Sequence, residues 1–163
     1  MTMRTGSLAA ALEREHHEID DGITAFTAAA GDREPLTRAI SALRRHIYLE
    51  EEILFPLLYQ AEPALAAPVF VMLREHAQIW ALLNSLEHAP RGDATAPARI
   101  RQLTSHLLHH NLKEEKILYP RADQALPAAE AGQLRAFLNS GELPAGWVCF
   151  NARPRKRAPR ARE

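Results

Sequence analysis

Apolar residues recur every three to four positions in four long stretches of the chain, which is the spacing of one buried helix face. Clusters of Gly, Pro and Asp interrupt the pattern and mark the connections between helices. The expected helices cover residues 6–30, 35–60, 65–89 and 96–124. Because the connections are short, consecutive helices should be antiparallel neighbours. The pattern therefore predicts an all-α fold, an antiparallel up-down-up-down four-helix bundle.

A shorter amphipathic segment follows the four predicted helices, over residues 128–140. Pro127 precedes it and Gly141 follows it, and this asymmetry is typical of the two ends of a helix. We therefore expect a short extra C-terminal helix. The predicted organisation is a bundle, a C-terminal helix with an extension, and a basic disordered tail, over residues 1–125, 126–151 and 152–163 respectively.

Composition agrees with one helical domain, since the 163 residues are 47% hydrophobic and contain only 7 glycines. The formal net charge is zero, but residues 153–163 carry six basic residues and one acidic residue. This tail cannot bury apolar surface, and we expect it to be disordered. We expect no nucleic acid as a partner of the bundle; only the tail could bind one or another anionic surface.

Cysteine usage and the lack of long apolar runs bear on location. Cys149 is the single cysteine, so the chain forms no internal disulfide. No run of about 18 apolar residues is present, and the N-terminus has no signal-peptide pattern. The expectation is a cytoplasmic protein without a membrane partner.

An internal repeat places chemically active residues on the predicted helices. Residues 46–56 and 110–120 both read H-x-x-x-E-E-x-I-L-[FY]-P, and residues 14–19 and 74–79 both read R-E-H-x-x-I. Each half is thus a helix with one histidine followed by a helix with His and Glu four residues apart. Two such halves can pack about a pseudo-two-fold axis. The repeat predicts one cluster formed by His16, His46, Glu50, His76, His110 and Glu114.

The spacing of four residues places His and Glu on the same helix face, one turn apart. That face should be buried, because it also carries Leu43, Ile53, Leu54 and Leu57 in one copy and Leu107, Ile117 and Leu118 in the other. Buried carboxylates need a compensating cation. Imidazole and carboxylate ligands suit zinc, iron, manganese or nickel. Six ligands exceed the needs of one structural zinc but suit two irons bridged by the carboxylates.

These motifs resemble the hemerythrin-like, HHE cation-binding domain family over about residues 8–124. The resemblance implies a four-helix bundle around a non-haem di-iron centre, often oxo- or hydroxo-bridged. It also implies that His16 and His46 hold one iron, that His76 and His110 hold the other, and that Glu50 and Glu114 bridge them. Zinc or manganese is the alternative. Ferritin-like carboxylate proteins fit less well, since their Glu-x-x-His motif occurs only once here, ending at His16.

The sequence differs from oxygen-carrying hemerythrins, whose third helix presents two histidines four residues apart. Here Met72 and Trp80 flank His76 at that spacing, and the last carboxylate is Glu114 rather than an aspartate. The symmetric set is more similar to di-iron proteins that repair iron–sulfur clusters after nitric-oxide or oxidative damage.

Several neighbouring residues carry separate expectations. His17 should be solvated, His88 and His109 should lie on the surface, and His106 is a possible additional ligand or donor to one. Glu51 and Glu115 should form salt bridges or contact ligands rather than bind metal, and Tyr48 should pack between helices. Pro56 and Pro120 should kink or end their helices just beyond the site.

The leading functional hypothesis is a di-iron protein that reacts with or senses dioxygen, nitric oxide or peroxide. Its role would be defence against oxidative or nitrosative stress, or repair of iron centres, with an electron donor or another protein as partner. The alternatives are a non-catalytic iron- or oxygen-responsive signalling module and an oxygen store. The sequence leaves open whether the protein is an enzyme.

Overall fold

The computed structural model describes residues 6–28 and 31–155, and this part of the chain contains helices and loops but no strand. The α-helices are α1 (Leu8–Ala28), α2 (Glu34–Leu49), α3 (Phe55–Ala61), α4 (Ala66–Glu87), α5 (Ala96–Lys113), α6 (Tyr119–Ala125) and α7 (Ala128–Ser140). Two π-helical turns, η1 (Glu50–Leu54) and η3 (Glu114–Leu118), and two 3₁₀ turns, η2 (Pro63–Leu65) and η4 (Phe150–Ala152), complete the helical structure.

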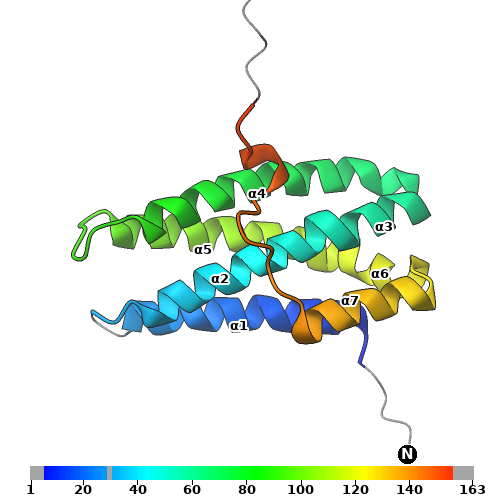
Figure 1. Ribbon diagram of the computed structural model, residues 1–163, viewed down its shortest axis with the longest axis horizontal. Coiled ribbons are helices and arrows are strands. Elements are labelled where there is room, and N and C mark those ends of the chain that lie inside the picture. Colours follow the sequence, from blue (N-terminus) through cyan, green and yellow to red (C-terminus); the bar gives the residue numbers. More distant parts are fainter. Residues whose placement is uncertain (1–5, 29–30, 156–163) are drawn as a thin grey trace, which may run out of the picture.

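Four rods make up the bundle, and Figure 1 shows that each runs against the direction of the one before it. The first and third rods are the single helices α1 and α4. The second rod is α2, η1 and α3 in continuous sequence, and the fourth is α5, η3 and α6. The predicted all-α bundle is therefore confirmed, and so is the extra C-terminal helix, which is α7.

The core has two apolar clusters along the length of the bundle. One surrounds Ile23, Leu83 and Leu103, toward the α1–α2 and α4–α5 connections. The other surrounds Leu12 and Leu58, toward α3 and α6, among other buried side chains. Burying one leucine side chain stabilises a fold by about 1.5–3 kcal/mol, so both clusters contribute strongly to cohesion. The polar cluster described below lies between them.

The π-helical turns occur at the same place in both copies of the repeat, directly before the aromatic residue that precedes each proline. The N–H of Phe55 bonds to the carbonyl of Glu50, five residues earlier, and the N–H of Tyr119 bonds to that of Glu114. A proline offers no N–H to a regular helix, and a wider turn accommodates this loss. The irregularity thus falls at the glutamates themselves, and helix resumes through each proline, so neither proline ends its rod directly beyond the site.

The π-helical turn at Glu114–Leu118 also explains why one predicted core position is wrong. Ile117, which was expected on the buried face, is 45% exposed. A π-helical turn holds an additional residue, so positions after Glu114 are rotated relative to a regular helix. Leu118, which was predicted on the same face, is buried.

The chain after α7 forms a strap, residues 141–153, that crosses α2 and reaches α4 (Figure 1). Cys149 is fully buried in the first apolar cluster, and Trp147 packs on Trp80 with ring centroids 5.5 Å apart. Ala152 ends the turn η4, and Arg153 lies over the Trp147 ring. The predicted division into three parts stays a prediction, and most of the expected disordered tail lies outside the described residues.

Of the helices within residues 6–28 and 31–155, none is both long enough and apolar enough to cross a membrane.

Candidate metal centre

The structure brings all six predicted residues together in the middle of the bundle. His16 comes from α1, His46 from the last turn of α2, His76 from α4 and His110 from α5, while Glu50 and Glu114 each begin a π-helical turn. All six side chains are buried, with at most 4% of any residue exposed. Four rods are needed to assemble the cluster.

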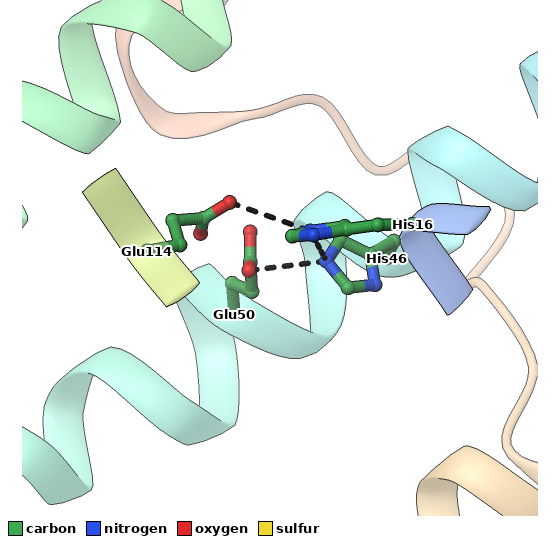
Figure 2. A group of neighbouring side chains, drawn as sticks. All are labelled: His16, His46, Glu50 and Glu114. Atoms are coloured by element: carbon green, nitrogen blue, oxygen red, sulfur yellow. Dashed lines mark hydrogen bonds and ion pairs between the residues drawn. The ribbon is translucent and has the colours of Figure 1, made fainter. Parts of the chain in front are cut away.

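The six residues form two groups that share the two glutamates. One group is His16, His46, Glu50 and Glu114, which Figure 2 shows, and the other is His76, His110 and the same two glutamates. Within each group the candidate ligand atoms lie within 4.8 Å of one another. This geometry permits two metal positions that share the two carboxylates.

Short distances join the histidine Nε2 atoms to the carboxylates. Glu50 places Oε1 3.1 Å from Nε2 of His46 and Oε2 3.1 Å from Nε2 of His76. Glu114 places Oε1 3.0 Å from Nε2 of His110 and 3.5 Å from Nε2 of His16. Each glutamate therefore reaches histidines from both groups, as a bridging carboxylate must.

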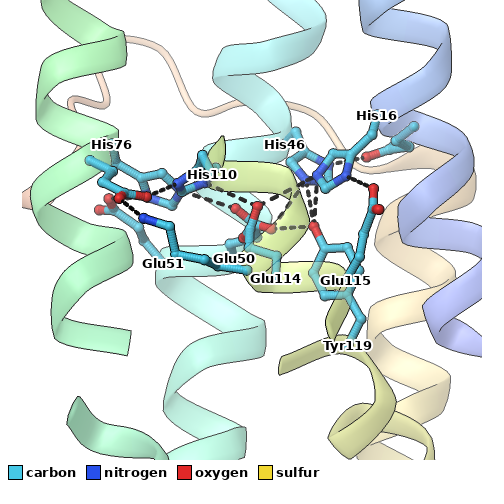
Figure 3. A network of polar contacts seen from close by, with 12 residues as sticks. His16, His46, Glu50, Glu51, His76, His110, Glu114, Glu115 and Tyr119 are labelled. Carbon is cyan, nitrogen blue, oxygen red and sulfur yellow. Dashed lines mark hydrogen bonds and ion pairs between the residues drawn. The ribbon is translucent and has the colours of Figure 1, made fainter. Parts of the chain in front are cut away.

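The other ring nitrogen of each histidine contacts its own glutamate outside the cluster (Figure 3). The Nδ1–carboxylate distances are 2.9 Å for His16–Glu115, 2.7 Å for His46–Glu15, 2.8 Å for His76–Glu51 and 2.8 Å for His110–Glu75. An ionised carboxylate only accepts hydrogen bonds, so each Nδ1 donates its hydrogen. The lone pair of each neutral imidazole is then on Nε2, which faces the centre, and this is the usual tautomer of a metal-binding histidine.

When its four imidazoles are neutral, the centre has more acceptors than donors. Nε2 of His16 and Nε2 of His46 lie 3.0 Å apart with their Nδ1 hydrogens already committed. Among the described residues, no hydrogen-bond partner exists for Oε2 of Glu50, Nε2 of His76 or either carboxylate oxygen of Glu114. Buried polar atoms without partners are costly, and a cation would satisfy all of them. The donor set therefore fits a metal centre.

The charges of the metal-free protein lead to the same conclusion. Burial disfavours a charged imidazole, but Glu114 and Glu75 outweigh it and raise the pKa of His110 to about 10. Burial likewise opposes ionisation of Glu50, but His46 and its neighbours hold the pKa of this carboxyl well below its usual value. The carboxylates thus require positive charge beside them. Protons supply it without metal, and metal binding would release those protons.

Tyr119 is a member of the centre that the sequence analysis missed. Its phenol donates to Oε1 of Glu50 at 2.6 Å, and its oxygen lies 2.9 Å from Nε2 of His16 and 3.0 Å from Nε2 of His46. Burial and the nearby carboxylates raise the pKa of Tyr119 well above its usual value. The available signal was the aromatic position before the proline of the repeat. Tyr48 packs between Phe137 and Trp147 instead, as expected.

The remaining expectations for single residues can be compared with the structure directly. His17, His88 and His109 are exposed, as predicted. His106 is partly buried and belongs to neither group of candidate ligands. Glu51 and Glu115 contact Nδ1 of His76 and Nδ1 of His16, two of the candidate ligands, as expected.

A helical bundle in which two groups of candidate ligands share two carboxylates has the arrangement of a metal-binding protein. Comparison with known families makes the assignment specific: the model of the hemerythrin HHE cation-binding domain matches residues 7–122. The chain therefore belongs to the hemerythrin HHE cation-binding domain family.

Similar proteins include iron–sulfur cluster repair proteins YtfE of Escherichia. The protein from Escherichia coli O81 (strain ED1a) is 32% identical over 98 residues, which cover 53% of this chain and 44% of that protein. Those from Escherichia coli O1:K1 / APEC and Escherichia fergusonii are 31% identical over the same length, with the same coverage. The match thus spans less than half the length of these relatives. No solved structure matches the chain.

Proposed function

We propose that the chain binds two iron ions in its centre. His16 and His46 would hold one ion, His76 and His110 the other, and Glu50 and Glu114 would bridge them. The observation that carries this proposal is that both glutamates belong to both groups of candidate ligands. Family membership and the iron–sulfur repair relatives favour iron over zinc or manganese.

The function that we propose is reaction with, or sensing of, dioxygen, nitric oxide or peroxide, in defence against oxidative or nitrosative stress or in repair of iron centres. Ferrous iron with an open coordination position would supply the redox chemistry. The ligand set would leave such a position, since each ion would receive two imidazoles and carboxylate oxygens from two glutamates. Repair activity is supported by the names of the relatives, of which the match covers 44% in length.

The protein's own contribution would be to hold the ligands and to exclude bulk water. Four glutamates outside the centre fix the orientation of the four imidazoles through Nδ1. The apolar clusters close the centre along the bundle, above and below the ligands. A buried, oriented cluster favours access of small uncharged molecules over larger ones.

Turnover assays test the proposed function. Iron-loaded protein should consume peroxide or nitric oxide, or restore a damaged iron–sulfur protein, in excess of its own iron content. A variant with Glu50→Ala should lose this activity, and His17→Ala should retain it, because His17 is exposed and outside both groups. If iron is bound without turnover and a partner protein binds in an iron-dependent manner, the non-catalytic signalling alternative is correct.

A further inference from the structure

The two halves of the metal centre are equivalent in their histidines and glutamates but not in the aromatic residue beside them. Tyr119 and Phe55 occupy matching positions of the repeat, each directly before its proline. Both side chains are almost completely buried, with at most 1% exposed. Tyr119 lies at the His16–His46 half, and Phe55 lies at the other half, stacked on His76 with ring centroids 5.7 Å apart.

The phenol oxygen of Tyr119 has the spacing of a metal ligand. It lies 2.9 Å, 3.0 Å and 2.6 Å from Nε2 of His16, Nε2 of His46 and Oε1 of Glu50. The two Nε2 atoms are themselves 3.0 Å apart, and Nε2 of His46 is 3.1 Å from Oε1 of Glu50. Adjacent ligands of an octahedral ion, each bound at about 2.1 Å, are about 3 Å apart.

With neutral imidazoles, hydrogen bonding alone does not account for this arrangement. The phenol has one hydrogen, and Glu50 receives it in the shortest of the three contacts. In the neutral imidazoles that a metal requires, the lone pairs of His16 Nε2 and His46 Nε2 face the same oxygen without a hydrogen, because their Nδ1 hydrogens bind Glu115 and Glu15. A cation among the four atoms would convert these contacts into bonds. Figure 3 shows the phenol directed at this group of atoms.

The opposite half offers no such oxygen. Phe55 is apolar, and Nε2 of His76, Oε2 of Glu50 and both oxygens of Glu114 lack hydrogen-bond partners among the described residues. Nε2 of His76, which would face an ion, is thus among the unpartnered atoms. In the first half, by contrast, Nε2 of His16 and Nε2 of His46 both contact the phenol oxygen. An ion held by His76 and His110 would keep a free position that an ion beside Tyr119 would not.

We propose that Tyr119 is a ligand of the ion held by His16 and His46, so that external small molecules bind at the ion held by His76 and His110. This inference rests on the proposed function, because it assumes iron at both positions. When the ion binds, the phenol oxygen loses its hydrogen as a proton to solvent, and the oxygen–metal bond takes its place. The two metal positions would then differ from each other, because the aromatic residue before the proline is Tyr119 in one copy of the repeat and Phe55 in the other.

Optical and resonance Raman spectra of the ferric protein test the inference. Wild-type protein should contain two irons per chain and show a visible phenolate-to-iron absorption band, with tyrosine ring vibrations enhanced on excitation in that band. The Tyr119→Phe variant should lose the band and keep both irons. Tyr48→Phe is the matched control and should keep it, since Tyr48 contacts Phe137 and Trp147 rather than the centre.

A double variant guards against an indirect effect of losing the hydroxyl. Tyr119→Phe combined with Phe55→Tyr moves the phenol to the other half and should restore a visible phenolate band. Two irons per chain without such a band in the wild type, or a band that persists in Tyr119→Phe, would overturn Tyr119 ligation and leave the proposed function intact. Protein that binds no iron would overturn both.

Discussion

Glu51 offers the most quantitative test of how the outer glutamates support the metal centre. Its side chain is 3% exposed and makes two contacts, one to Nδ1 of His76 at 2.8 Å and one to the backbone N–H of Phe150 at 2.7 Å. Glu51→Ala removes both. His76 then loses the partner that fixes its ring, and the strap loses one attachment to the bundle.

The expected loss can be worked out for each contact. Losing the partner of a metal-binding histidine costs about 10–100-fold in metal affinity. This should affect the ion at His76 and not the other one. The unpaired Nδ1–H of buried His76 lowers the stability of the metal-free protein by about 1–3 kcal/mol, and the exposed N–H of Phe150 adds little because water replaces its partner. Glu51→Gln keeps an acceptor of the same shape, so its loss of affinity should be smaller.

Glu52 is the matched control, one residue further along the same turn. It also holds the strap, through Nε1 of Trp147 at 2.9 Å and a guanidinium nitrogen of Arg153 at 3.3 Å, but it contacts no histidine. Anaerobic titration with ferrous iron against a competing chelator should resolve one weakened site in Glu51→Ala and none in Glu52→Ala. Equal loss of affinity in both variants, or none in Glu51→Ala, would refute this account of Glu51.

Three further predictions concern the centre itself. Glu50→Ala or Glu114→Ala should lower the metal content from about two ions per chain towards one or none. The control His17→Ala should leave the metal content unchanged, and full retention of metal in both glutamate variants would contradict bridging. Chelation of the metal should lower the free energy of unfolding by about 2.7 kcal/mol per ion where free metal had been about 100 times its Kd, and an unchanged urea midpoint argues against a site formed only on folding. The pKa of His110 is raised from 6.5 to about 10 in the metal-free state, so its contribution to stability is complete below about pH 6.5 and is lost as pH rises towards 10. Urea titrations of metal-free protein should show this decline in the free energy of unfolding, and a rise over that pH range would contradict it.

Much of the fold and the candidate ligand set could be predicted because the two halves of the sequence carry the same motifs. Four stretches of helical periodicity specify four rods, and the repeated His–Glu spacing places two imidazoles beside two carboxylates. Spatial proximity of all six residues then follows from antiparallel packing. The structure places these six side chains in two groups, as the repeat implies.

Other features could not be read from periodicity. A π-helical turn depends on how a helix accommodates a proline in three dimensions, so the exposure of Ile117 was not foreseen. Helix spacing also did not indicate that Tyr119 faces the centre, because the π turn between Glu114 and Leu118 rotates it relative to a regular helix. The attachment of the strap to Glu51 joins residues 99 positions apart, without any local pattern.

The sequence pattern identified only two of the four duplicated glutamates that contact the histidines from outside the centre. Glu51 and Glu115 were expected to contact ligands because they repeat beside the ligand pair. Glu15 and Glu75 repeat equally, within R-E-H-x-x-I, and they hold His46 and His110. Each of these glutamates contacts a histidine of another helix, and a pattern along a single helix does not contain that relation.

Metal content together with the optical spectrum of freshly purified protein tests the central claim most directly. The account predicts about two irons per chain and, in the oxidised protein, the near-ultraviolet absorption of a bridged ferric pair. Zinc or manganese in place of iron, or a single ion per chain, would contradict it.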